Sequence, residues 1–360
     1  MKASSQSFWQ ASWKRLKKNK GAMAGLVMIF ISILIAIFGY FISPDPSPFA
    51  NRIILEVGGE KPGYTRNFLL VKKEARPVSF FEWLISGKPD RYEYIPVSSY
   101  YIQPDSIIAQ KYIDEGVSER IGYHKNALAA NPVRQKTFYL GTDKYGRDIL
   151  SRLIIGTRVS LSVGLITVII SLTVGILLGA IAGYFRGRAD NIIMWLINVI
   201  WSIPTLLLVF AITLLLGKGF WQVFIAVGLT MWVNVARLVR GQVLATKELQ
   251  YVEAAKALGF SNFRIIVRHI LPNIFGPILV IAASNFASAI VIEAGLSFLG
   301  VGVQPPQPSW GLMIKENYNF IITQNPMLAL APGFAIMILV LSFNLLGNGL
   351  RDALNVRGRI

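Results

Sequence analysis

The sequence predicts an all-α, polytopic membrane protein with six transmembrane helices and a large insert between the first two. Hydrophobic residues make up 53% of the 360 residues and charged residues only 15%, whereas a soluble domain carries about 25% charged residues. The apolar residues also gather into uncharged runs of about 20 residues, the length that an α-helix needs to cross a bilayer core. Together these two observations predict the fold class.

The first apolar run covers residues 22–42 and follows a basic segment that contains no acid, residues 1–21. A cleaved signal peptide has an apolar core of about 7–15 residues and a small-x-small cleavage site. This run is longer, and Ser43-Pro44-Asp45-Pro46 offers no such site. We therefore expect residues 22–43 to form an uncleaved transmembrane helix, preceded by a cytoplasmic N-terminal segment.

Residues 44–152 are polar, rich in proline, tyrosine and charge, and contain no run that could span a bilayer. The pattern favours a helix near residues 105–130, and an aromatic run extends from residue 80 to residue 85. We expect this stretch to be an extracytoplasmic insert.

Five further apolar runs form a helical core, residues 153–350. Their predicted ranges are 157–184, 192–216, 220–239, 274–292 and 328–350. Six spans return the chain to the side on which it began, so residues 351–360 are expected to be a cytoplasmic tail. Lysine and arginine gather in the segments that this topology places inside the cell, as the positive-inside rule requires.

Gly175, Gly179 and Gly183 recur at every fourth position of the second span and so share one helix face. Small residues let a neighbouring backbone approach closely in lipid, where helix association has no hydrophobic driving force. We predict that this stripe packs against another helix. The alternative is that these are glycines of the kind that membrane helices commonly contain, without a special role.

The net charge of +17 does not indicate nucleic acid, because the basic clusters lie beside apolar spans and form no stripe with interleaved aromatic residues. The chain has no cysteine, and its two histidines, His124 and His269, are far apart in the sequence. We therefore predict no nucleic-acid partner, no metal site and no cofactor bound by this chain.

The loop between the fourth and fifth spans, residues 240–273, is long and patterned. Residues 247–258 are expected to be helical, and they share one apolar face formed by Tyr251, Ala254, Ala255 and Leu258. Two short cytoplasmic helices with small alanines would make a docking surface, because small side chains let a partner's cleft close around the backbone.

The ends of these two helices are marked in the sequence. Gly259 ends the first, since glycine takes the left-handed C-terminal position at little cost. Ser261 caps a second helix, residues 262–270, which Pro272 ends.

Glu253-Ala254-Ala255, Gly259 and His269-Ile270-Leu271-Pro272-Asn273 resemble the EAA loop of the permease subunits of binding-protein-dependent ABC importers. In that family the loop forms a coupling helix that inserts into a groove of the ATPase subunit. The resemblance implies ATPase-coupling roles for Glu253, Ala254, Ala255, Gly259, Leu271 and Pro272. His269 stands where the general pattern has isoleucine, and the His-Ile-Leu-Pro-Asn form is typical of the peptide and nickel branch.

Two further stretches resemble the dipeptide, oligopeptide and nickel branch of this family. One enters the second span: Leu140-Gly141-Thr142-Asp143, Gly146-Arg147-Asp148 and Ser151-Arg152. The other follows the fifth span: Glu293-Ala294-Gly295-Leu296-Ser297-Phe298-Leu299-Gly300, Gln304-Pro305-Pro306 and Pro308-Ser309-Trp310-Gly311. The resemblance covers the first span and residues 140–360. It departs in the long insert and in the tail, where Asn348, Asn355 and Val356 stand in place of Asp, Asp and Pro.

The resemblance implies a C-type permease with the type I ABC importer fold, in a bacterial inner membrane, with both termini cytoplasmic. Its implied partners are two ABC ATPase subunits, a second homologous permease subunit and an extracytoplasmic substrate-binding protein. No Gly-x-x-x-x-Gly-Lys-Ser/Thr loop occurs in the sequence. ATP-Mg is therefore expected on the partner subunits, and no catalytic residue is expected here. Peptides are the implied substrate; nickel chelates, glutathione and sugars are alternatives.

Glu293 ends the fifth span, where a carboxylate is costly. It is either a residue that lines or gates a pathway, or an interfacial carboxylate satisfied by backbone amides. The tryptophans, Trp201 among them, are expected in interfacial belts.

A secondary transporter is the alternative from another class, but it would need ionisable groups at mid-membrane or broken helices in paired halves. A membrane enzyme would need a cluster of catalytic groups. The sequence indicates neither.

Overall fold

The computed structural model describes residues 8–217, 219–322 and 325–354. The chain forms two compact units. The first, here called the helical unit, comprises Met1–Ser32, Ser160–Gln304 and Ile336–Ile360. The second, the sheet unit, comprises Ile33–Val159 and Pro305–Ala335. The predictions for residues 1–7 and for the tail beyond residue 354, including Asn355 and Val356, lie outside the described residues.

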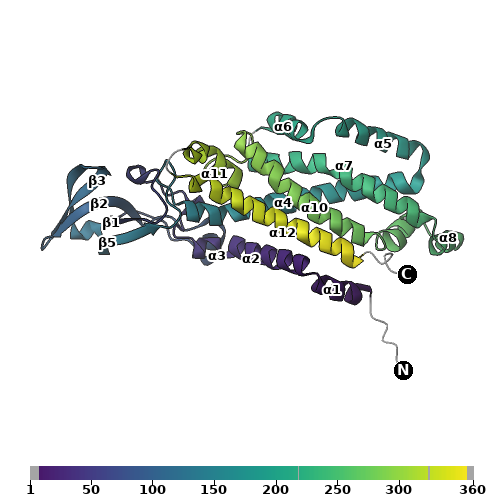
Figure 1. Ribbon diagram of the computed structural model, residues 1–360, viewed down its shortest axis with the longest axis horizontal. Helices are drawn as coiled ribbons and strands as arrows, with labels where there is room; N and C mark the ends of the chain where they lie inside the picture. Colours follow the sequence, from purple (N-terminus) through teal and green to yellow (C-terminus); the bar gives the residue numbers. More distant parts are fainter. Residues whose placement is uncertain (1–7, 218, 323–324, 355–360) are drawn as a thin grey trace, which may run out of the picture. The chain divides into compact units, whose positions relative to one another are not determined.

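Most of the helices and strands are labelled in Figure 1, with numbers in chain order. The helices are α1 Phe8–Lys18, α2 Lys20–Ile42, α3 Phe80–Ser86, α4 Ile149–Phe185, α5 Gly187–Trp201, α6 Thr205–Leu216, α7 Phe220–Lys247, α8 Gln250–Ala257, α9 Asn262–Ile265, α10 Phe275–Phe298, α11 Trp310–Asn317 and α12 Met327–Leu354. Short 3-10 turns are η1 Pro48–Ala50, η2 Leu55–Val57, η3 Lys125–Ala127 and η5 Tyr318–Ile321, and η4 Ile266–Ile270 is a π-helical turn. The strands are β1 Tyr64–Lys72, β2 Tyr92–Ile102, β3 Ser106–Asp114, β4 Val117–His124 and β5 Leu128–Phe138.

The predicted helical membrane fold is confirmed. Among the described residues, α2, α4, α7, α10 and α12 are long and apolar enough to cross a membrane. The predicted span at residues 192–216 consists of two helices, α5 and α6, bent by 93° at the break between them. The sequence analysis did not predict this bend. Pro204 explains it, because proline lacks an N–H donor and moves the preceding residue out of the helical region. The chain has six spans if α5 and α6 form one broken span.

In the helical unit, α4 and α7 approach each other closely along the glycine stripe. A Cβ added at Gly175 would lie 2.5 Å from Cβ of Val235, and one added at Gly179 would lie 2.5 Å from the carbonyl oxygen of Ala236. At Gly183 the nearest atom, the carbonyl oxygen of Arg240, would be 2.8 Å away. The stripe therefore lies where only glycine lets the two backbones meet.

The same helix α7 also holds α5. Ile193 and Ile197 of α5 are buried in a cluster that includes Trp232 and Ala236 of α7. One turn further on, Nε and Nη2 of Arg240 donate to the two oxygens of Asp190, at 2.5 and 2.6 Å. Most of α7 is thus enclosed by its neighbours, and it forms the centre of the helical unit (Figure 1).

The insert contains a five-stranded antiparallel sheet that the sequence analysis did not predict. Its strand order is β4-β3-β2-β1-β5. The predicted helix near residues 105–130 is wrong, because this stretch forms β3, β4, η3 and the start of β5. The aromatic run at residues 80–85 forms the short helix α3, whose first turn is capped by the side chain of Ser79 accepting from the Glu82 N–H.

The sheet is buried on both faces around β1. Phe68 and Leu70 pack in one cluster with Ile54, Val57 and Phe138. Leu69 lies between them in the chain and points to the other face, where it packs with Ile95, Val97 and Ile107. A strand that is apolar on both sides lacks the alternation typical of a surface strand, so its period gives no clear signal.

The segment that enters α4 carries a network of buried ion pairs in the sheet unit. The Arg147 Nε donates to Asp143 at 2.6 Å and its Nη2 donates to Glu316 at 2.7 Å. The Arg152 side chain, 1% exposed, lies 3.5 Å from Glu316 and 3.9 Å from Asp143. Two arginines and two carboxylates therefore neutralise one another away from water, and they fix α11 to the start of α4.

A second buried pair adjoins this segment. Burial raises the pKa of the Asp148 carboxyl and lowers the pKa of the Lys136 ammonium, and the two charged groups lie 3.8 Å apart. Asp148 also accepts from the N–H groups of Leu150 and Ser151, at 3.1 and 3.4 Å, and so caps the first turn of α4.

Gly179→Ala should destabilise the protein, because the added methyl group overlaps the backbone of α7. We expect the free energy of unfolding to fall by about 1–3 kcal/mol, measured as a lower thermal unfolding temperature in mild detergent. Gly241→Ala is the matched control, since no atom lies within 4 Å of its added Cβ. Equal effects of the two substitutions would show that the stripe has no packing role.

Asp143→Leu should also destabilise the protein, because it leaves Arg147 and Arg152 buried with one carboxylate between them. Breaking a buried ion pair costs about 3–5 kcal/mol. The same unfolding measurement tests this, with the exposed Glu74→Leu as its control. An unchanged unfolding temperature for Asp143→Leu would contradict the structural role of the network.

Candidate functional site

The first candidate site is the loop between α7 and α10, where α8 and α9 form a small helical hairpin. Gly259 has a φ of 76°, the left-handed conformation that ends α8 without strain. The side chain of Ser261 accepts from the Arg264 N–H at 3.4 Å and caps α9. The two helices thus begin and end close to where the sequence places them.

One face of this hairpin packs on the helical unit. Val252 and Ala255 of α8 are buried together with Val243 of α7. Ile265 and Ile270 join this cluster from the second arm of the hairpin, which consists of α9 and η4. Two polar contacts reach the end of α4: the Tyr184 hydroxyl donates to Asn262 Oδ1 at 2.8 Å, and Lys247 Nζ donates to the Tyr184 carbonyl at 2.6 Å. The hairpin is therefore fixed to both α4 and α7.

The opposite face of α8 is exposed. Glu253 and Ala254 lie on it, and Leu258 at its end is 74% exposed. Of the four residues predicted to share an apolar face, Ala255 is buried, whereas Tyr251, Ala254 and Leu258 are exposed. An apolar, small-residue face left open beside a carboxylate suits a protein partner.

The second arm contains a π-helical turn, η4. The ring of His269 stacks on Phe260 at 5.8 Å between centroids, and the His269 carbonyl accepts from Asn273 Nδ2 at 2.6 Å. Leu271 is half-buried and Pro272 exposed. The Tyr251 hydroxyl of α8 joins the two arms by donating to the His269 carbonyl at 3.5 Å. Burial raises the pKa of this phenol.

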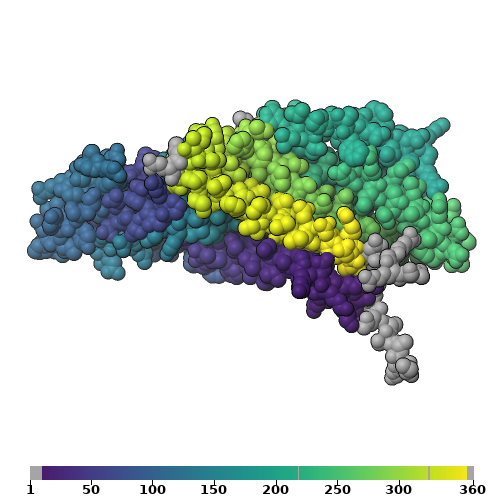
Figure 2. All heavy atoms as spheres, in the orientation of Figure 1, coloured from purple at the N-terminus to yellow at the C-terminus, as the bar shows by residue number. Residues whose placement is uncertain are grey.

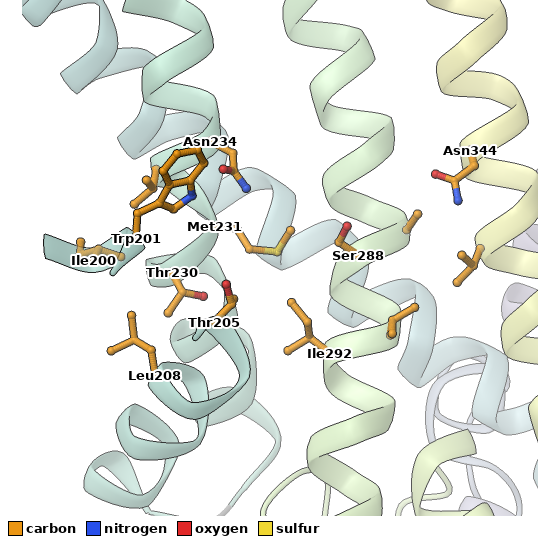
Figure 3. A pocket seen from close by; sticks show the side chains of 14 residues that line it. Ile200, Trp201, Thr205, Leu208, Thr230, Met231, Asn234, Ser288, Ile292 and Asn344 are labelled. Atoms are coloured by element: carbon orange, nitrogen blue, oxygen red, sulfur yellow. The ribbon is translucent and has the colours of Figure 1, made fainter. Parts of the chain in front are cut away.

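The second candidate site is a pocket of about 500 Å³ in the helical unit. It lies among α5, α6, α7, α10 and α12, and Figure 3 shows Met231 and Ser288 facing each other across it, with Asn344 facing it from α12. The polar side chains that line it are Thr205, Thr230, Asn234, Ser288 and Asn344.

All fourteen residues that line the pocket are uncharged. Their amide and hydroxyl groups both donate and accept hydrogen bonds, so they can pair with the neutral polar groups of a ligand. A cation adjoins one wall: the guanidinium carbon of Arg237 lies 3.5 Å from the ring centroid of Trp201.

The sequence analysis did not single out this pocket. Trp201, expected in an interfacial belt, lines it instead. Asn234 and Asn344 could have indicated it, since an amide side chain inside an apolar span is costly unless it has a function or a partner.

Glu293 does not line the pocket. It is fully buried in α10, and its Oε1 accepts from the Ser297 hydroxyl at 2.6 Å. Ser297 in turn accepts from the Val303 N–H at 3.0 Å. Gly302 lies against Ser297 so closely that a Cβ would overlap it. The carboxylate therefore holds the turn that follows α10.

Family models and known proteins resemble this chain over most of its length. The binding-protein-dependent transport system inner membrane component matches residues 175–359, and the N-terminal TM domain of oligopeptide transport permease C matches residues 7–54. The dipeptide transport system permease protein DppC of Bacillus subtilis is 32% identical over 359 residues, covering 100% of this chain and 89% of the relative.

Two other relatives are similar. The di/tripeptide transport system permease protein DppC of Pseudomonas aeruginosa is 34% identical over 95% of this chain and 90% of its own length. The glutathione transport system permease protein GsiD of Pectobacterium atrosepticum is 43% identical over 60% of this chain and 72% of its own length. A solved structure of the MetNI methionine ABC transporter in inward facing conformations aligns with a TM-score of 0.48 at 17% identity, over 57% of this chain and 97% of that chain.

Proposed function

Because this chain belongs to the family of binding-protein-dependent transport system inner membrane components, we propose that it is a transmembrane permease subunit of an ATP-driven importer for peptides. The observation that carries the proposal is the arrangement of α7. The middle of α7 lines the uncharged pocket. Its end packs against the hairpin of α8 and α9, whose other face is exposed. One rigid helix thus joins a ligand-sized space to a surface suited to a partner.

The pocket is the proposed part of the translocation pathway that this chain supplies. Its amide and hydroxyl side chains can exchange hydrogen bonds with peptide groups, which are themselves neutral donors and acceptors. No histidine, cysteine or carboxylate side chain is among the residues that line the pocket. This supports a peptide over a bare nickel ion, for which imidazole and other nitrogen or oxygen ligands are typical.

The hairpin is the proposed ATPase-docking site. Glu253, Ala254 and Leu258 present its open face, while Ala255, Gly259, Leu271 and Pro272 shape the hairpin behind it. ATP-driven closure of two ATPase subunits would move α8, and α7 and α4 would transmit the movement to the pocket as a switch between two states. ATP-Mg and its hydrolysis belong to the ATPase subunits in this proposal, and this chain is non-catalytic.

The remaining partners and the placement follow from the family. A second permease subunit would complete the pathway, and an extracytoplasmic substrate-binding protein would deliver the peptide. The chain would lie in the inner membrane with both termini in the cytoplasm and the insert, residues 44–152, outside. Glu293 would act on the pathway's gate through Ser297 and the turn after α10.

Glu253→Arg should abolish coupling, because it places a long cation on the face that meets the ATPase. Loss or reversal of a charge at such an interface costs about 2–5 kcal/mol. The tagged chain should then no longer co-purify ATPase subunits from mild detergent, and peptide-stimulated ATPase activity should be lost. The exposed Glu119→Arg, in the sheet unit, makes the same charge change and should leave both unaffected. A wild-type chain that is folded and yet brings down no ATPase would refute the importer assignment.

Ser288→Trp should block transport, because an indole would fill part of the pocket opposite Met231. We expect peptide uptake in reconstituted vesicles to be lost while the ATPase subunits still co-purify. Leu215→Trp is the control, since Leu215 is 86% exposed on α6 and does not line the pocket. Normal uptake by Ser288→Trp would show that the substrate passes elsewhere.

A further inference from the structure

The N-terminal helix α1 is strongly basic on the side that faces away from the protein. Its exposed cations are Lys14, Arg15, Lys17 and Lys18, and the first 21 residues of the chain contain no acid. Lys14 and Lys18 are four residues apart and therefore lie on one face. No carboxylate within α1 neutralises them.

The other side of α1 is fixed to the helical unit. Ser12 and Leu16, also four residues apart, are buried. Leu16 packs with Ala22 of α2 and with Leu350 and Ala353 of α12, and Gly349 lies so close to Ala22 that a Cβ there would overlap it. Asn19, between the two helices, accepts from the Ala22 N–H at 3.1 Å in the first turn of α2 and donates to Asp352 of α12 at 3.5 Å. These contacts hold α1 against the end of α12, where Figure 2 shows the purple N-terminal segment beside the yellow C-terminal helix.

This face lies at the edge of a membrane span. α2 begins at Lys20, and Lys14 precedes it by a distance of about 9 Å at 1.5 Å per residue. That is close to the Debye length of about 8 Å at physiological ionic strength, so every cation of α1 is within reach of lipid phosphates. Trp13 is 47% exposed with Lys17 Nζ 5.4 Å from its ring centroid, and an exposed tryptophan beside lysine is typical of the membrane interface.

We propose that α1 is a binding site for anionic phospholipid headgroups of the inner leaflet, which cover its basic face and hold it against the end of α12. The charge complementarity is direct: α1 carries four exposed cations and no acid of its own, and the cytoplasmic leaflet carries anionic lipid. The neighbouring acid is Asp352 of α12, which pairs with the Asn19 side chain. The proposal rests on the cytoplasmic placement of the N-terminus but does not depend on the substrate or on the ATPase.

The full chain in nanodiscs of phosphatidylcholine, with or without phosphatidylglycerol, tests this. Because the chain contains no cysteine, Gln10→Cys carries a single spin label on α1. Phosphatidylglycerol should immobilise the label, and high salt should release it. The variant K14Q/R15Q/K17Q/K18Q should weaken this response by more than about tenfold, since each cation near an anionic surface contributes about fivefold.

The matched control removes four exposed cations from the sheet unit: K73Q/R91Q/R120Q/K125Q. It should respond to phosphatidylglycerol as the wild type does. Equal responses of the α1 variant and the wild type would overturn the proposal. So would an α1 variant that binds the lipid normally but no longer co-purifies ATPase subunits, because α1 would then dock on protein. Loss of transport with an unchanged lipid response would bear on the proposed function alone.

Discussion

The contact between the backbones of α4 and α7 is the constraint on which the helical unit depends. In lipid, two apolar helices gain little by hiding their side chains from each other, so close van der Waals packing has to hold them. The glycines of α4 supply that packing along three successive turns. The result is a paired, stiff element whose one end is fixed to the hairpin of α8 and α9, and whose middle forms a wall of the pocket. Asn234 and Lys247 lie about 20 Å apart along α7, so a displacement at the hairpin reaches the pocket without any flexible link.

The pocket of the helical unit and the α4 entry segment of the sheet unit meet the cost of buried polar groups in different ways. In the helical unit the pocket is lined by neutral amides and hydroxyls, which need only hydrogen bonds. In the sheet unit, arginines and carboxylates are buried together and neutralise one another. Buried ion pairs contribute little net stability compared with apolar packing, but losing one partner is costly. The network of Asp143, Arg147, Arg152 and Glu316 therefore holds together segments that are distant in the sequence.

The sequence predicted what depends on composition and local chemistry. Uncharged runs located the spans. Gly259 and Ser261 marked the end of α8 and the start of α9, and the glycine stripe of α4 predicted a close helix contact. Prediction from the sequence failed where the structure depends on contacts between residues far apart in the chain. Residues 105–130 form strands because β3 pairs with β2 and β4, and such pairing cannot be read from the local sequence. The pocket could not be predicted either, because Trp201, Ser288 and Asn344 come together from separate helices. The bend at Pro204 was within reach, since proline disfavours the helical conformation of the residue before it.

The open face of α8 follows from its short length and its anchoring. A helix of this length is not stable alone, so Val252 and Ala255 have to be buried on the helical unit to form it. Only one side of so short a helix can serve that purpose, and Tyr251, Ala254 and Leu258 are left to solvent. In a chain that worked alone, 74% exposure of Leu258 would be a liability for aggregation. It is accounted for if a partner covers it, and the small Ala254 beside it then lets that partner approach the backbone. The helix α1 at the N-terminus is arranged in the same way: one face is buried on the protein and the other is exposed to whatever surface binds it. Both helices are attached to the ends of long spans, α1 beside α12 and α8 beside α7, so whatever covers either face acts directly on a membrane helix.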